Sequence, residues 1–283
     1  MFTLFSKEAV SLPENVLTLQ MTKFDGTEET SVKEAPVHPE KPQPYKLMPH
    51  FAVYDVKLYQ SNDPTVQSVT GQASIELIKT KEGWSYKLNL QLQINKYDGT
   101  TTTIERNIAS WESPSDISFH IENFRDGASE TILQGGAERA ENGEWRIYFE
   151  EPKMDGFITN QNIIFPIGHL ENILEAIKNH ELVLPDQIVF DATYEIHKPV
   201  RINTVITPLK DKNVAIKDSS LLPSGEQWCL KKALYNLDSL SSSPDYEENK
   251  IDIFSTGVIS KMETSWGEGI TVILNLKELT VYQ

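Results

Sequence analysis

The sequence predicts a mainly β protein: a large antiparallel meander, curled into a β-spiral or open barrel, with one amphipathic helix at about residues 166–180. Asp-Gly or Asn-Gly pairs at 98–99, 126–127 and 142–143 separate segments in which apolar and polar residues alternate. Such pairs are the strongest local hairpin signal, because both central positions of the favoured turn need positive φ. The alternation predicts strands with one buried face.

The predicted strands follow one another along most of the chain. Alternation is clearest from Trp84 to Ile94, and Pro114 marks one of the turns. The full set is expected at residues 52–58, 69–78, 84–94, 101–111, 117–125, 128–139, 144–150, 187–196, 200–208, 228–238, 250–262 and 270–282. Residues 238–249 are expected to form a polar hairpin tip, and Gly267 and Gly269 the last turn. No fixed-period repeat is present, so neither a propeller nor a solenoid is expected.

One segment has helical rather than strand periodicity. Its apolar residues fall on one face of a helix: Ile167, Leu170, Ile173, Leu174 and Ile177. Pro166 suits a first helical turn, where its missing N–H has no partner to lose. Lys178 and His180 lie at the other end, where the helix dipole favours positive charge. We expect the apolar face to pack on the sheet and to cover an open end or a cavity.

Residues 1–46 are expected to form an N-terminal extension, and residues 47–283 a single β-spiral domain. From Glu34 to Pro44 a proline occurs at every second or third position, which favours extended, polyproline-like structure. This stretch is therefore expected to be a linker. A short strand is expected before it, at residues 16–21.

The composition limits the partners and the compartment. A formal net charge of -15 disfavours binding to nucleic acids and to anionic lipids. Cys229 is the one cysteine, so neither an intramolecular disulfide nor a multi-cysteine zinc site can form. No segment has the length and apolarity of a membrane-spanning helix, so we expect a protein that does not span a membrane. The first residues lack a signal-peptide pattern, so the protein is cytosolic or its export signal lies outside this numbering.

Catalytic and metal-binding motifs are missing from the sequence. The histidines are scattered, without the paired spacing of a metal site. The adjacent carboxylates at 150–151 and 247–248 would point to opposite faces of a strand. No nucleophile elbow or phosphate-binding loop occurs. We expect no enzyme activity, no cofactor and no metal. A hydrolase built from converging carboxylates and histidines is the weakest alternative.

Five residues are candidates for a ligand or partner surface. They are His169 in the first helical turn and the aromatic residues Trp84, Tyr86, Trp111 and Trp145. Core packing explains most aromatic residues in such a fold. A curled sheet can also leave an apolar concavity that accepts an acyl chain or a peptide. His169 is expected either to hydrogen-bond a neighbouring strand or turn, or to contact a ligand.

Two short motifs carry a family resemblance. The first, MPHFAVYD at 48–55, opens the regular region and contains Pro49, His50, Tyr54 and Asp55. The second, FPIGHL at 165–170, opens the helix with Phe165 and Pro166. A strand containing Trp228 then precedes a terminal hairpin that ends in LKEL. In this order the segments resemble the EipB family of cell-envelope integrity proteins of Gram-negative bacteria, over roughly residues 48–282.

The resemblance implies a non-enzymatic periplasmic protein that maintains envelope integrity. We expect it to bind another envelope protein, through a strand edge or the apolar concavity. The alternative is a lipid or lipoprotein carrier, since the family shares a general look with periplasmic lipoprotein carriers. Family members carry a disulfide, but Lys81 occupies its early position here and Cys229 does not match the late one. The disulfide, and any oxidative control of folding, should therefore be absent.

Overall fold

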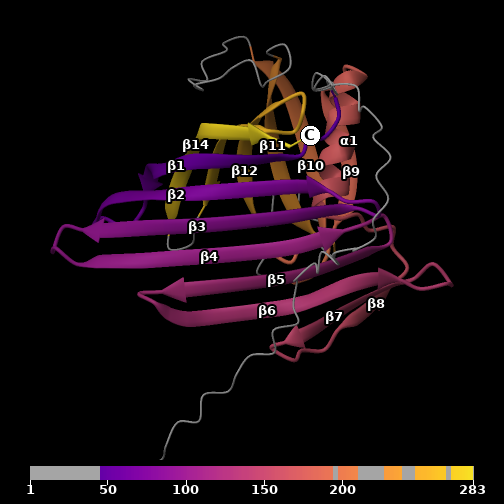
Figure 1. The fold of residues 1–283 in the computed structure, drawn as a ribbon, viewed down its shortest axis with the longest axis horizontal. Coiled ribbons are helices and arrows are strands. Elements are labelled where there is room, and N and C mark those ends of the chain that lie inside the picture. The colour runs from indigo at the N-terminus through magenta and orange to yellow at the C-terminus, as the bar shows by residue number, and fades with distance from the viewer. Residues whose placement is uncertain (1–44, 194–196, 210–225, 238–245, 266–268, 283) are drawn as a thin grey trace, which may run out of the picture. The chain divides into compact units, whose positions relative to one another are not determined.

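The computed structural model describes residues 45–193, 197–209, 226–237, 246–265 and 269–282. These residues form one antiparallel sheet of 14 strands, in the order β8-β7-β6-β5-β4-β3-β2-β1-β14-β13-β12-β11-β10-β9 (Figure 1). The end strands β8 and β9 do not pair with each other, so the sheet is not closed. The predicted mainly β meander with one helix is confirmed. Most of the predicted extension, with the strand at 16–21, lies outside the described residues.

The sheet has two arms that meet at β1. The first arm is a meander of consecutive strands: β1 (His50–Ser61), β2 (Val66–Lys79), β3 (Trp84–Lys96), β4 (Thr101–Glu112), β5 (Asp116–Arg125), β6 (Ala128–Arg139), β7 (Trp145–Glu151) and β8 (Phe157–Thr159). The second arm returns toward β1: β9 (Val183–Val189), β10 (Val200–Leu209), β11 (Gln227–Asn236), β12 (Tyr246–Phe254), β13 (Ile259–Ser265) and β14 (Ile270–Val281). Pairing of β1 with β14 joins the arms, with Val56 opposite Leu274.

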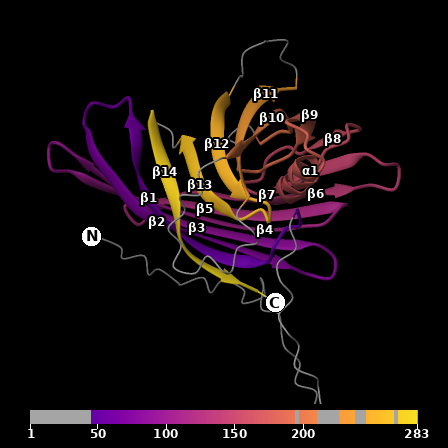
Figure 2. The same cartoon turned by 90° about the horizontal axis from the view of Figure 1, so that it is seen from above.

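The helix α1 (Pro166–Lys178) connects the end of one arm to the end of the other. Figure 2 shows it between the ribbons of β9 and β10 and those of β6 and β7. Just before it, Ile164 crosses to the second arm: its N–H donates to the carbonyl of Ile188, and its own carbonyl accepts from Phe190. The buried face of α1 packs against Leu184, Ile206 and other apolar side chains of the second arm. The helix therefore covers the inner face of that arm, as its periodicity predicts.

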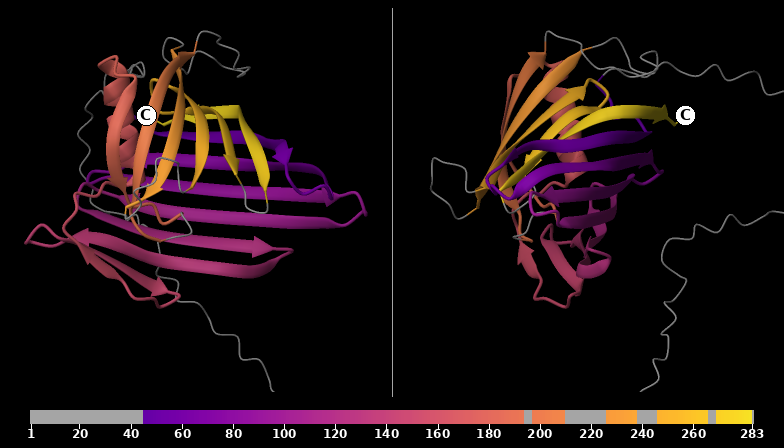
Figure 3. Two further views of the ribbon diagram at one scale, coloured as in Figure 1. Left: turned by 180° about the vertical axis from the view of Figure 1, so that it is seen from behind. Right: turned by 90° about the vertical axis from the view of Figure 1, so that its left-hand side faces the viewer.

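The alternating pattern places one face of most of the strands inside. On β1 the buried residues Ala52, Tyr54 and Val56 alternate with partly exposed ones. Opposite them across the pairs lie buried residues of β2 and β14. The two arms diverge on either side of β1 and enclose these inner faces (Figure 3). Because each fully buried aliphatic or aromatic side chain contributes about 1.5–3 kcal/mol, this face holds the fold together.

Two of the three predicted Asp-Gly or Asn-Gly turns are not the expected two-residue type. Only Asp126 and Gly127 form the expected two-residue turn with positive φ at both positions, 51° and 77°. At 98–99 and 142–143 only the glycine has positive φ, because these hairpins use longer loops. In the first of these, the N–H of Lys96 donates to the carbonyl of Thr100. Glycine is needed at these positions because other residues are strained there.

Two strand predictions and one hairpin prediction were wrong in their bounds. The segment expected at 250–262 is two strands, β12 and β13, because the chain turns at Gly257 with φ 81°. β12 also begins at Tyr246, inside the stretch expected as a hairpin tip; residues 238–245 lie outside the described part. β9 covers 183–189 rather than 187–196, and contains Pro185, which an end strand tolerates. β8 was not predicted, since three residues are too few to reveal alternation.

Candidate functional site

The N-terminus of α1 is held by a carboxylate from the other arm. Phe165 precedes the helix and offers no side-chain cap. Instead, Glu112 at the end of β4 accepts the N–H of Ile167 at 2.9 Å and that of Gly168 at 2.7 Å. These groups have no partner within the helix, so the carboxylate replaces a local cap. Glu112 thereby fastens the first arm to the helix that packs on the second.

The environment of Glu112 opposes its ionisation. Its side chain is buried, and this loss of solvation raises the pKa to about 7, although the two backbone N–H groups pull it down. Nearby Glu171 and Asp191 add to the rise through charge repulsion. The carboxyl group therefore changes protonation near neutral pH while it is bonded to the helix.

Trp84 lies beside the same end of the helix. It sits opposite Glu112 across β3 and β4, packs with Ile167, and donates its indole N–H to Glu171 at 3.1 Å. The ammonium of Lys79 lies 4.4 Å from the centre of its ring, within the range of a cation–π contact. The indole thus joins β3 to the first turns of α1.

His169 faces the second arm from the first turn of α1. Its Nδ1 donates to the side-chain oxygen of Gln187 at 2.7 Å, and its Nε2 lies 3.5 Å from the hydroxyl of Thr204. Burial, together with the positive charge of Lys232, lowers its pKa to about 3. The imidazole is therefore neutral at physiological pH and connects α1 to β9 and β10. The expected hydrogen bond to a neighbouring strand is present.

The other aromatic candidates do not gather at one place. Tyr86 lies on the inner face of β3, where burial raises the pKa of its hydroxyl. Trp111 pairs with Ser85, the neighbour of Trp84, so it lies on the opposite face of the sheet from Trp84. Trp145 packs its ring at 84° against Phe165, with 5.0 Å between the centroids. The structure thus brings His169, Trp84, Tyr86 and Trp145 to the interior near α1 and places Trp111 on the opposite face of the sheet.

The first family motif connects strands near β1. The Nδ1 of His50 donates to the carbonyl of Met48 at 2.6 Å, and burial lowers the pKa of this histidine. The hydroxyl of Tyr54 donates to the carbonyl of Ile259, while Asp55 pairs with Lys277 at 3.2 Å.

Pro49 and Phe165 complete the two motifs. The carbonyl of Pro49 accepts the N–H of Tyr282 at 3.0 Å. Phe165 and Pro166 set the start of α1 against Trp145. Both motifs therefore have structural contacts in this fold.

Besides Glu112, the sequence analysis missed three charged residues that the structure places at least partly in the interior. Arg106 lies between the buried residues Ile104 and Ile108 on the inner face of β4. Lys232 lies between Leu230 and Leu234 on the inner face of β11. Asp191 follows β9 and interacts electrostatically with Lys232. A charged residue at an apolar position of a strand was a signal that the sequence offered for the first two, whereas Asp191 has no such signal.

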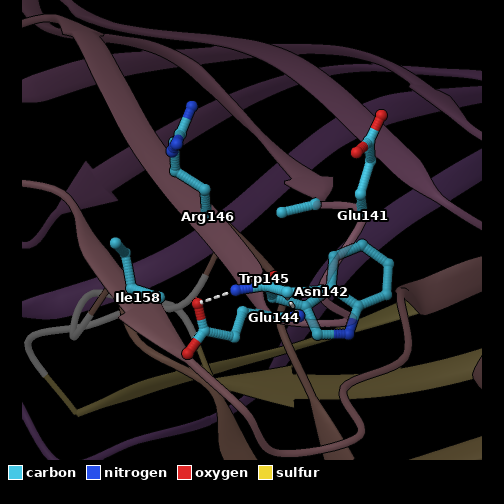
Figure 4. A pocket seen from close by; sticks show the side chains of 7 residues that line it. Glu141, Asn142, Glu144, Trp145, Arg146 and Ile158 are labelled. Carbon is cyan, nitrogen blue, oxygen red and sulfur yellow. Dashed lines mark hydrogen bonds between the residues drawn. The ribbon is translucent and has the colours of Figure 1, made fainter.

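A surface pocket of about 380 Å³ lies at the β6–β7 hairpin (Figure 4). Its lining includes Glu141, Glu144 and Arg146 with the apolar Trp145 and Ile158. Asn142 donates to Glu144 within the hairpin at 2.6 Å. Its charged, open lining suits water or a polar partner better than an acyl chain.

Three further findings bear on possible chemistry and on membrane insertion. Among the residues that the structure describes, no three His, Cys, Asp or Glu side chains are placed to share a metal ion. The described residues contain no helix that is long and apolar enough to cross a membrane. Cys229 is a buried free thiol, and burial raises its pKa to about 11, with a further contribution from Asp252. A thiol of this kind is mostly unreactive at neutral pH.

Comparison with known proteins adds a family and a fold. A family model described as EipB-like matches residues 41–283. The chain is also similar to the crystal structure of a beta-barrel-like protein of a domain of unknown function from Brucella abortus. The two are 17% identical, with a TM-score of 0.73, over 84% of this chain and 99% of that one. No curated protein matches the chain. At this identity the likeness supports the fold alone.

Proposed function

The chain belongs to the EipB-like family, and on that premise we propose that it is a non-enzymatic periplasmic protein that keeps the bacterial cell envelope intact by binding another envelope protein. The family match supports the compartment and the role. The observation that carries partner binding is an exposed apolar patch at one end of the sheet.

This β9–β10 patch consists of Leu182, Val183 and Val205. Their side chains are 53%, 53% and 42% exposed. Val183 and Val205 are direct neighbours across β9 and β10, and the carbonyl of Leu182 accepts the N–H of Ile206 at 2.8 Å. Val183 and Val205 therefore form an exposed apolar pair on one face, and the exposed Leu182 precedes Val183 in the chain. Such a surface favours burial against a partner.

The surroundings of the patch indicate the chemistry of the partner. Lys231 is the next residue beside Val205 on β11; it is exposed and forms no ion pair with any described residue. An apolar centre with a charged rim is typical of a protein interface. Pro185 in β9 discourages addition of a strand to this edge. We therefore expect the partner to dock through apolar side chains accompanied by a carboxylate.

The test uses cells that lack the native protein and receive variants of it. The double substitution Val183→Lys and Val205→Lys should leave the fold intact, since both side chains are exposed, but should fail to restore resistance to deoxycholate. Tyr97→Lys, at an exposed turn residue far along the first arm, is the matched control and should restore it. A photo-crosslinker at position 205, but not at 97, should capture a specific envelope protein. Full protection by the double variant would refute the proposed surface.

The second candidate is a carrier of lipids or lipoproteins. The surface pocket offers it little support, because charged side chains line it. What favours it is Lys232, which lies on the inner face of β11, keeps some accessible surface and forms no ion pair with any described residue. Lipid extraction of protein purified from the envelope separates the two functions, since a carrier should retain stoichiometric acyl species.

A further inference from the structure

A row of residues crosses the outer face of the first arm from β2 to β7, strands that Figure 1 shows side by side. Each member of this outer row lies directly opposite the next across a strand pair: Ile78, Ser85, Trp111, Ser118, Gly136 and Tyr148. The residues next to them in sequence, such as Leu77, Trp84 and Ile147, are buried. Because side chains alternate along a strand, the outer row points away from the core.

The three large side chains of the outer row are not part of the core. Ile78 and Tyr148 are each 36% exposed, and Trp111 is partly exposed. None of the three belongs to the apolar clusters that the described residues form. The indole N–H of Trp111 is not buried, and no described residue accepts a hydrogen bond from it. These apolar side chains are therefore open to contact with a partner.

The apolar groups of the outer row have a regular spacing. A Cβ atom added to Gly136 would lie 2.6 Å from the hydroxyl oxygen of Tyr148, so the phenol ring extends from β7 over β6. The apolar groups therefore lie over β2, β4 and β6, with the small Ser85 and Ser118 on the strands between them. Since neighbouring strands are about 4.8 Å apart, these groups repeat about every 10 Å. A polyproline II helix presents every third residue on the same side, at intervals of about 9 Å, so its repeat matches that of the outer row.

The polar groups of the outer row suit the backbone of such a ligand. A polyproline II segment has no internal hydrogen bonds, so its carbonyl groups need donors from elsewhere. The hydroxyls of Ser85 and Ser118 and the indole N–H of Trp111 are donors along the row, and none of them is bonded to a described residue. They could therefore donate to the ligand without breaking a bond within the sheet.

The charges beside the Tyr148 end of the outer row are mainly negative. Partial burial raises the pKa of the Tyr148 hydroxyl. The charges of three nearby carboxylates add to this rise: Glu150, Glu138 and Asp116. Arg146 pairs with Glu138 at 3.1 Å and offsets one of these charges, whereas the other two carboxylates form no ion pair with a described residue. A basic group of a ligand would therefore be attracted to this end of the row.

We propose that the outer row binds a proline-rich segment of a partner protein in polyproline II conformation, with prolines packed on Ile78, Trp111 and Tyr148 and a basic residue beside the carboxylates near Tyr148. Grooves lined by aromatic side chains commonly recognise such segments. The outer row is distinct from the β9–β10 patch, which lies on the second arm. The proposal goes beyond the proposed function, because it adds a second surface that selects a basic partner segment, whereas the β9–β10 patch is expected to meet a carboxylate.

The experiment measures oxidation of the unmodified protein by hydroxyl radicals, followed by peptide mass spectrometry. The probe is a synthetic polyproline peptide that ends in a pair of arginines. In excess, it should slow oxidation of Trp111 and Tyr148 at least about twofold, because the bound peptide would cover both rings. The exposed Tyr97, at the far end of β3 from Ser85, should react equally with and without the peptide. In fluorescence anisotropy with labelled peptide, Trp111→Ala should weaken binding at least about tenfold, whereas Tyr97→Ala should leave it unchanged.

The alternatives have separate outcomes. Equal protection by a polyproline peptide that ends in glutamates would overturn the role of the carboxylates, and equal protection by a glycine–serine peptide that ends in arginines would overturn the polyproline II fit. Protection by a chitin oligosaccharide but not by the probe would assign the outer row to a sugar and overturn the proposal, as would no protection at all. Since oxidation uses the unmodified protein, these results do not depend on whether Trp111→Ala folds. The Val183→Lys, Val205→Lys variant should bind the probe as the wild type does, so failure of the proposed function and failure of this site are distinguishable.

Discussion

Replacement of Glu112 with glutamine should change how the stability of the fold depends on pH. Both carboxylate oxygens of Glu112 accept N–H groups at the start of α1. Glutamine has nearly the same size but cannot ionise, and it offers one oxygen in place of two. The substitution therefore removes the ionisable group that joins β4 to α1, while it preserves most of the packing.

The sign of the effect follows from the direction of the pKa shift. In the unfolded chain Glu112 loses its proton near its ordinary pKa of 4.5, whereas in the fold it holds the proton up to about pH 7. Between these values the folded state binds more protons, so the free energy of unfolding falls as the pH rises and levels off above 7. The difference amounts to about 3 kcal/mol at 1.36 kcal/mol per unit of pKa.

His169 works in the opposite direction. Its pKa is lowered from 6.5 to about 3, so its neutral form is stabilised in the fold and the free energy of unfolding falls as the pH drops below 6.5. The two effects oppose each other between about pH 4.5 and 6.5. The wild-type curve should thus be flatter than either group alone would make it. The difference between wild type and Glu112→Gln isolates the carboxyl group.

The assay is urea unfolding followed by tryptophan fluorescence, from about pH 5 to about pH 8. Relative to wild type, Glu112→Gln should gain about 2.5 kcal/mol over this range, whatever its offset at the acid end. Glu175→Gln is the control, because Glu175 is exposed on the same helix and pairs with Lys178 at the surface. If the curves of wild type and Glu112→Gln run parallel, the carboxyl group does not titrate as argued.

Three further substitutions test other contacts. His169→Asn should lower the free energy of unfolding by about 1–3 kcal/mol at neutral pH, since it leaves Gln187 unpaired in the interior; an unchanged urea midpoint would contradict this. Gly71→Ala should cost about 1–3 kcal/mol, because an added methyl group would meet the carbonyl of Gln91 on β3; a neutral effect on thermal unfolding would mean that the strands move apart freely. Trp84→Phe should cost about 1 kcal/mol through loss of the bond to Glu171; no change in the urea midpoint would show that this bond contributes little.

The sequence determines the strands better than the contacts between the arms. Alternation predicted β3 to within two residues at its end. The reason is that apolar and polar residues alternate locally along a strand with one buried face. The pairing of β1 with β14 depends on residues more than two hundred positions apart, which no local pattern encodes. For the same reason, the sequence does not predict that Trp84 and His169 both contact the first turns of α1. Arg106 and Lys232 were visible as breaks in the pattern, but their shared surroundings were not.

The missing N-cap of α1 shows how a local defect can point to a remote contact. Helices usually begin after Ser, Thr, Asp or Asn, and Phe165 stands at that position instead. The unpaired N–H groups of Ile167 and Gly168 then required an acceptor from elsewhere, and Glu112 on β4 supplies it. Since β8 and β9 leave the sheet open, the helix provides a connection between the arms that strand pairing does not. A loss of stability in Glu112→Gln at acid pH, where the native carboxyl is neutral, would measure how much this connection depends on the second oxygen rather than on charge.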